Sequence, residues 1–104
     1  MTRPANTLRG EASFTVAGKD LVLRPSFENL VAVEEEVGSL FALVERASAG
    51  ELTLTEISAL LWHCLPTDNR PERQAIGAAV LSMGLVPATV PVRALLAQIL
   101  QGEQ

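Results

Sequence analysis

The 104-residue chain has no tyrosine, one tryptophan, one histidine and one cysteine. A lone cysteine cannot form a disulfide within the chain, and one cysteine with one histidine cannot complete a structural zinc site of four protein ligands. His63 and Cys64 are neighbours, and neighbouring side chains on a helix point about 100° apart, so they cannot easily share a metal or act as base and nucleophile. We therefore expect no catalytic site, no metal and no cofactor, and hence no enzyme.

Basic residues are also few. The chain carries 8 Lys and Arg against 12 Asp and Glu, which gives a formal net charge of −4. Binding to nucleic acid relies on clustered Lys and Arg that contact phosphates. The charge balance therefore argues against nucleic acid as the partner.

No uninterrupted apolar segment of membrane-spanning length is present. The longest stretch without a charged residue, 74–92, approaches that length, but it contains Gly77, Gly84, Pro87 and Pro91. This pattern predicts a helix, a stop and a new helix, all packed in a protein core. The first ten residues have no apolar segment typical of a signal peptide, so we expect a cytoplasmic protein that does not bind membranes.

The N-terminal part of the chain has the pattern of a β-hairpin. Polar and apolar residues alternate from Leu8 to Val16, and a second apolar run covers Leu21 to Arg24. Residues 17–20 form the predicted turn, in which Gly18 can adopt a positive φ angle. We predict a hairpin at 8–24 after a flexible tail at 1–7. Because an isolated hairpin is barely stable, it must pack on helices or pair with another chain.

Helix-capping signals dominate the rest of the chain. Ser26 and Ser39 are suitable N-caps, and Thr53 with Glu56 fits the capping box. Thr89 is the predicted N-cap of the last helix, with Pro91 in its first turn. The predicted helices cover about residues 27–37, 40–49, 54–65, 71–83 and 90–101. Their apolar stripes place Phe27, Leu30, Val33 and Val37 inward on the first, and Ile76, Ala79, Val80 and Met83 inward on the fourth.

These elements predict an α+β fold: an N-terminal β-hairpin followed by four or five short packed helices. All connections are short, and the chain is of common domain size, so we expect a single domain over 1–104 with a helical body at 26–101.

Three apolar side chains are candidates for binding a partner. Trp62, the only tryptophan, lies one residue off the inward stripe of its helix, and such a residue is either at the edge of the core or an interface anchor. Leu96 and Leu100 belong to a last-helix stripe that is wide for a peripheral helix and in which Arg93 is the only charge. Core packing is the commoner explanation for such a stripe, and self-association or partner binding is the alternative.

A helix-turn-helix interpretation is the less favoured alternative. Arg70 and Arg73 open the fourth helix, where a recognition helix would meet DNA. The rest of that helix is rich in Ala, Gly, Val and Leu, which offer little to contact bases. A small DNA-binding regulator therefore has weak support.

The order of several segments resembles a known family. These segments are Leu8–Glu11 entering a strand, the turn at Val16–Lys19, Leu21–Phe27, Leu30–Gly38 and Glu51–Glu56. In this order and spacing they resemble the small tail accessory proteins of gene transfer agents and related phages, which are grouped with phage tail assembly chaperones. The resemblance covers about residues 8 to 65, and the sequence departs from it at Leu65-Pro66, where relatives continue with a Gly-containing stretch.

The resemblance implies a non-enzymatic role in tail morphogenesis. It implies an assembly chaperone that binds the long helical tape measure protein, or other tail proteins, while tube subunits polymerise. The alternative is a structural tail tube or minor tail subunit, which would assemble into rings and stay in the particle. The low content of predicted strand argues against the tube. The hairpin edge also offers self-pairing into a weak homo-oligomer.

Overall fold

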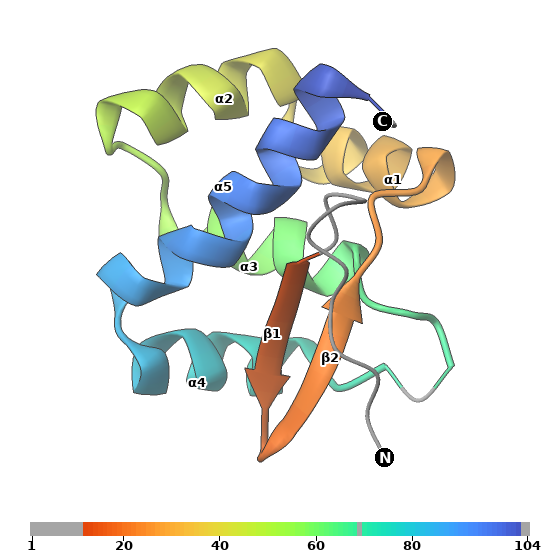
Figure 1. Cartoon of the computed structure of the whole chain (residues 1–104), viewed down its shortest axis with the longest axis vertical. Helices are drawn as coiled ribbons and strands as arrows, with labels where there is room; N and C mark the ends of the chain where they lie inside the picture. The colour runs from red at the N-terminus through yellow and green to blue at the C-terminus, as the bar shows by residue number, and fades with distance from the viewer. Residues whose placement is uncertain (1–11, 69, 103–104) are drawn as a thin grey trace.

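Two strands and five helices make up the part of the chain that the computed structural model describes, residues 12–68 and 70–102 (Figure 1). The strands are β1 (Ala12–Val16) and β2 (Lys19–Leu23), and the helices are α1 (Phe27–Val37), α2 (Leu40–Ala49), α3 (Leu54–His63), α4 (Arg73–Met83) and α5 (Leu85–Gln101). The predicted α+β fold, a hairpin followed by packed helices, is confirmed. The predicted tail at 1–7 and the start of the predicted first strand at 8–11 lie outside the described residues.

The hairpin turn is shorter than predicted. Val16 lies opposite Lys19 in the antiparallel ladder, so only Ala17 and Gly18 form the turn, with φ angles of 52° and 81°. Two consecutive positive φ angles are typical of the type I′ turn, whose twist matches that of the flanking strands. Residues 19 and 20, part of the predicted turn, therefore belong to β2.

The predicted caps of the first three helices are confirmed. The side chains of Ser26 and Ser39 accept hydrogen bonds from the backbone N–H groups three residues later. Thr53 and Glu56 form the reciprocal capping box. Helix α3 ends at His63, two residues before its predicted end, with Cys64 as C-cap. Such signals act within one turn, which is why the sequence locates them well.

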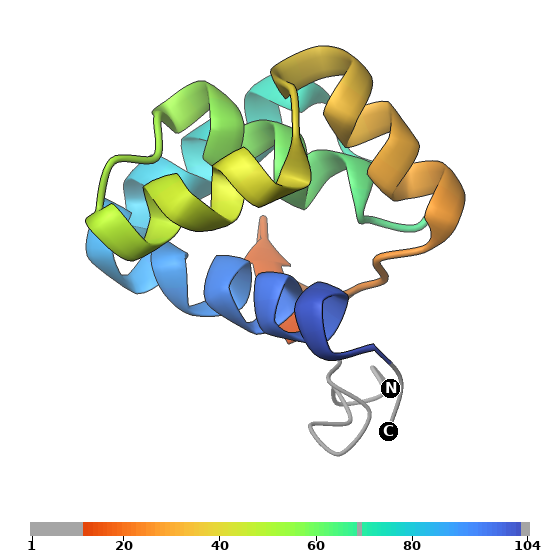
Figure 2. The same cartoon turned by 90° about the horizontal axis from the view of Figure 1, so that it is seen from above.

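Helix α3 supplies the centre of the core. Its residues 57–61 are all buried, and α1, α4 and α5 pack around it. In the two views, α5 and the hairpin form one side of the molecule, with α3 behind them (Figures 1 and 2). Phe14, Val16 and Leu23 of the hairpin are buried against the helices. The backbone N–H of Arg24 donates to the carbonyl of Cys64 at 2.7 Å, which ties the end of β2 to the end of α3.

The structure differs most from the sequence prediction at helix α5. It begins at Leu85, directly after Gly84, and Pro91 lies inside it. Thr89 is not an N-cap, because its hydroxyl donates to the carbonyl of Val86 at 2.6 Å within the helix. Pro87 is in the first turn, where a missing N–H leaves no intrahelical bond unmade. Pro91 removes one bond to the carbonyl four residues earlier, but its ring is buried in the core and gains packing there.

Smaller corrections concern α1 and α4. Phe27, predicted to point inward, is 82% exposed because it is the first residue of α1, ahead of the turns that pack on α3. Met83, at the last turn of α4, is also exposed rather than inward. Helix α4 begins at Arg73, with Glu72 as N-cap, and not at Pro71.

Among the described residues, no single helix has both the length and the apolar character to cross a membrane. Helices α4 and α5 meet these criteria only when taken together, and they bend by 117° at Gly84.

Candidate partner-binding groove

An apolar groove lies between α2 and α5. It is formed by two adjoining hollows that share Ala47 and Arg93 in their linings. Val44 and Ser48 lie beside Leu96 and Leu100 at one end, whereas Gly50 lies beside Leu85 and Thr89 at the other, so α2 and α5 run in opposite directions along the groove. The lining also includes Leu52, Leu54, Ile57, Val86 and Ala97. We refer to these residues together as the α2/α5 groove.

Several large aliphatic side chains of this groove are open to water. Val86 is 80% exposed and Leu100 is 54% exposed, and Leu54 and Leu85 are exposed as well. Scattered apolar residues are normal on protein surfaces, but aliphatic residues gathered in one concave place are typical of a surface that binds another molecule.

Helix α5 is apolar on two of its faces. Ala88, Val92 and Leu95 are buried in the core. Val86, Arg93 and Leu100 follow at intervals of seven residues, which return to nearly the same side of a helix, and all three line the groove. The wide apolar stripe predicted from the sequence therefore faces both the core and the α2/α5 groove.

Among the residues that the structure describes, Arg93 is the only charged side chain in the lining of the groove. Within the described residues it is exposed and makes no salt bridge or side-chain hydrogen bond. The groove thus offers one unpaired cation surrounded by aliphatic groups.

An ion pair fixes the wall of the groove. Arg46 of α2 pairs with Glu56 of α3, whose carboxylate also accepts a hydrogen bond from the backbone N–H of Thr53 at 2.9 Å. Burial raises the pKa of Glu56, but the hydrogen bonds from Thr53 and Arg46 outweigh it and hold the pKa below its usual value of 4.5. Glu56 is therefore ionised at neutral pH and holds α2 beside α3.

Trp62 lies in a different place, among contacts with α4 and the segment before it. Its indole N–H donates to the carbonyl of Pro71 at 2.9 Å. The guanidinium carbons of Arg70 and Arg73 lie 4.4 and 5.4 Å from the centre of the ring, within the range of cation–π interactions. Arg70 also donates to the carbonyl of Leu65 at 2.8 Å. We call these residues, together with Glu36 and His63, the Trp62 cluster.

Glu36 joins α1 to this cluster. Its carboxylate pairs with Arg73 and lies 2.9 Å from Nε2 of His63. The hydrogen bond from Arg73 lowers the pKa of Glu36 below 4.5, against the raising effect of burial, and the contact with His63 lowers it further. Arg70 and Arg73, the residues that a helix-turn-helix protein would direct at DNA, are both engaged within the fold.

The three predicted partner-binding residues are not brought together. Leu96 and Leu100 both line the groove, although Leu96 is 4% exposed and contributes mainly to the core. Trp62 is half-buried in its own cluster and is absent from the lining. Its role in binding a partner stays a prediction.

His63 and Cys64 have different surroundings. His63 contacts Glu36, whereas Cys64 is fully buried, and desolvation raises the pKa of its thiol to about 12 despite the nearby Arg70. A thiol with this pKa stays protonated and unreactive at neutral pH. No group of three or more His, Cys, Asp or Glu side chains in the described part of the chain is arranged to hold a metal ion.

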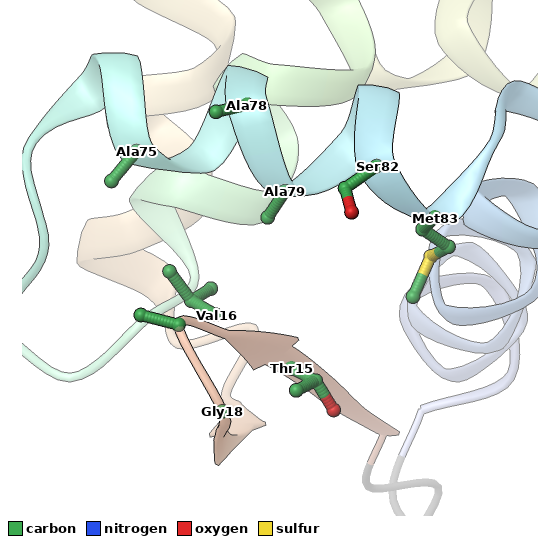
Figure 3. Close-up of a pocket in the computed structure, with 9 residues that line it drawn as sticks. Thr15, Val16, Gly18, Ala75, Ala78, Ala79, Ser82 and Met83 are labelled. Carbon is green, nitrogen blue, oxygen red and sulfur yellow. The ribbon is translucent and has the colours of Figure 1, made fainter.

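A separate hollow, of about 640 Å³, lies between α4 and the tip of the hairpin (Figure 3). Its lining consists mainly of small side chains such as Ala78, Ala79 and Ser82, with Met83 at one end, and no charged residue of the described part of the chain belongs to it. It lacks the exposed leucines and the cation that distinguish the α2/α5 groove.

Sequence reasoning missed most of the groove. The sequence places Leu85 and Val86 in a connection, because it predicts that the last helix starts after Thr89. It shows Arg93 as the only charge in the stripe of that helix. That isolated charge was the signal that could have located the groove.

Residues 9–102 of the chain match the model of the family described as phage tail tube protein, GTA-gp10. Comparison with curated proteins and with solved structures gives no significant match.

Proposed function

Because the chain belongs to the family described as phage tail tube protein, GTA-gp10, we propose that it is a non-enzymatic tail-assembly chaperone that holds a helix of another tail protein in its α2/α5 groove. The predicted membership among gene transfer agent and phage tail proteins is thereby confirmed at the level of the family. The chaperone role and the tape measure protein as its client are our proposal.

The observation that carries this proposal is the groove itself. Aliphatic side chains line it from Leu85 to Leu100, a distance of about 22 Å along α5 at 1.5 Å per residue. A partner helix of about four turns fits this length. Binding of an amphipathic helix in an apolar groove is a common mode of peptide recognition, and it suits a helical client that needs cover before assembly.

A structural tail tube subunit is the second candidate, and the description of the family favours it. A tube requires each subunit to bind further copies of itself. Within residues 12–68 and 70–102 the only sheet is the two-stranded hairpin, so sheet-to-sheet contacts between copies would have to use the outer edge of β1 or of β2. This limited strand content favours the chaperone.

Co-expression with the tape measure protein of the same tail gene cluster, followed by pull-down and sizing, tests the proposal. We expect soluble co-purification with the wild-type chain and its loss with Leu100→Asp or Val86→Asp. Leu81→Asp is the matched control, because Leu81 is an exposed apolar residue on α4 outside the groove.

Two results would contradict the chaperone. One is a tape measure protein that stays insoluble with the wild-type chain while the chain alone forms rings. The other is retention of the chain in finished tails as a stoichiometric component. Either result would replace the chaperone with the tube subunit.

A further inference from the structure

The cation of the α2/α5 groove is placed near the middle of its length. Arg93 is eight residues after Leu85 and seven before Leu100, so about 10 to 12 Å of apolar lining extends to either side of it along α5. It belongs to both hollows. Any occupant that covers the whole groove must therefore cover Arg93.

The other arginines near the core are already engaged. Arg46 pairs with Glu56, Arg73 pairs with Glu36, and Arg70 is bonded to the carbonyl of Leu65. Arg93 differs, because no carboxylate of the described chain reaches it. Covering this charge with purely apolar groups would remove its hydration without a replacement, which is costly.

The walls of the groove favour a helix over an extended segment. Both long walls are helices, whose backbone groups are bonded internally, so an extended peptide would find no main-chain partners there. A helix satisfies its own backbone groups and presents only side chains.

We propose that the α2/α5 groove recognises an amphipathic helix that carries one Asp or Glu in the middle of its apolar face, paired with Arg93. This inference rests on the proposed function and adds the chemistry of the client. Leucines on either side of the carboxylate fill the two hollows, and the ion pair fixes the position of the client helix along the groove. A client with Lys or Arg at that point is rejected by charge repulsion.

Three synthetic peptides test this inference. Each is a helix of roughly 16 residues, matching the length of the groove, with Leu and Ala on one face and uncharged polar residues on the other. They differ only at the centre of the apolar face, which carries Glu, Gln or Lys. Affinity for the full chain is measured by fluorescence anisotropy of a label on the peptide.

We expect the Glu peptide to bind the wild-type chain roughly tenfold more tightly than the Gln peptide, and the Lys peptide to bind most weakly. Arg93→Glu should invert the order, and raising the salt concentration should weaken the preference in both proteins. Lys19→Glu is the control, because it makes the same change of charge on the hairpin, outside the lining of the groove. It should leave the order unchanged.

Each of three outcomes would overturn the inference. In the first, the Glu and Gln peptides bind equally and Arg93→Glu does not invert the order. In the second, none of the peptides binds. In the third, the chain alone sediments as a dimer that Arg93→Glu dissociates, which makes a second copy the occupant. If the peptide test fails but the tape measure protein co-purifies with the wild-type chain and not with Leu100→Asp, only the preference for a carboxylate is wrong. Absence of co-purification with the wild-type chain would remove the proposed function itself.

Discussion

The Trp62 cluster and the α2/α5 groove both combine apolar groups with arginine, but they differ in how these groups are paired. In the cluster, the indole N–H, Arg73 and the carboxylate of Glu36 all have partners within the chain, although Nε of Arg70 does not. In the groove, Arg93 has no partner among the described residues, and Leu100 and Val86 face water.

The difference indicates separate roles for the two regions. The contacts of Trp62 and Glu36 connect α1, α3 and the start of α4, so removing them should lower the free energy of unfolding. The exposed groups of the groove contribute little to the folded state, because folding has not removed them from water. Replacing these groups should therefore change the affinity for a partner and leave the free energy of unfolding nearly unchanged.

The largest effect on stability is expected from Trp62→Ala. The substitution removes a large half-buried ring, its hydrogen bond to Pro71 and the surface on which Arg70 lies. We predict that the free energy of unfolding falls by about 3 kcal/mol, near the lower end for truncation of an aromatic residue because the ring is not fully buried. Urea denaturation measures this loss. Peptide affinity of the folded variant should be unchanged, and a variant that stays stable but loses binding would make Trp62 the anchor that the sequence also allowed.

An intermediate effect is expected from acid. Glu36 and Glu56 both have pKa values below 4.5 in the folded protein, so the stability that they contribute is complete above pH 4.5 and is lost as the pH falls through the lower folded values. Glu36→Gln should cost up to about 1 kcal/mol at pH 7, because its partners are partly exposed and screened by water. It should also shrink the loss of stability between pH 7 and pH 3. Urea denaturation of both proteins at the two pH values tests this, and equal losses would mean that Glu36 contributes nothing.

Local signals explain which parts of the fold were predictable. Ser26, Ser39 and Thr53 act on backbone groups within one turn, so their sequence neighbours are enough to predict the helices that they begin. The start of α5 was not predictable in this way. Pro87 and Pro91 in the sequence suggest a break in the helix, whereas the packing of Pro91 and Val92 in the core favours a continuous helix.

The sites depended on contacts between distant segments. The sequence could single out Trp62 but not its contact with Pro71 or the approach of Arg73 to Glu36, which are 37 residues apart. It could place Leu96 and Leu100 on one stripe, but not show that α2 stands far enough from α5 to leave Leu100 uncovered. Such spacing between helices is a property of the whole packed core, and no local pattern contains it.

The smallest effect on stability, and the sharpest test of the comparison, is expected from Leu100→Asp. Leu100 lies at the exposed end of α5, so we predict a change in the free energy of unfolding within about 0.5 kcal/mol. The affinity for the Glu peptide should nevertheless fall at least roughly tenfold, because the substitution removes a leucine contact that the peptide would bury and puts a carboxylate against the apolar face of the peptide. Leu81→Asp should change neither quantity. Denaturation and anisotropy on the same samples separate the two effects. If Leu100→Asp lowers stability as much as Trp62→Ala does, the groove belongs to the core, and it is not a surface kept open for a partner.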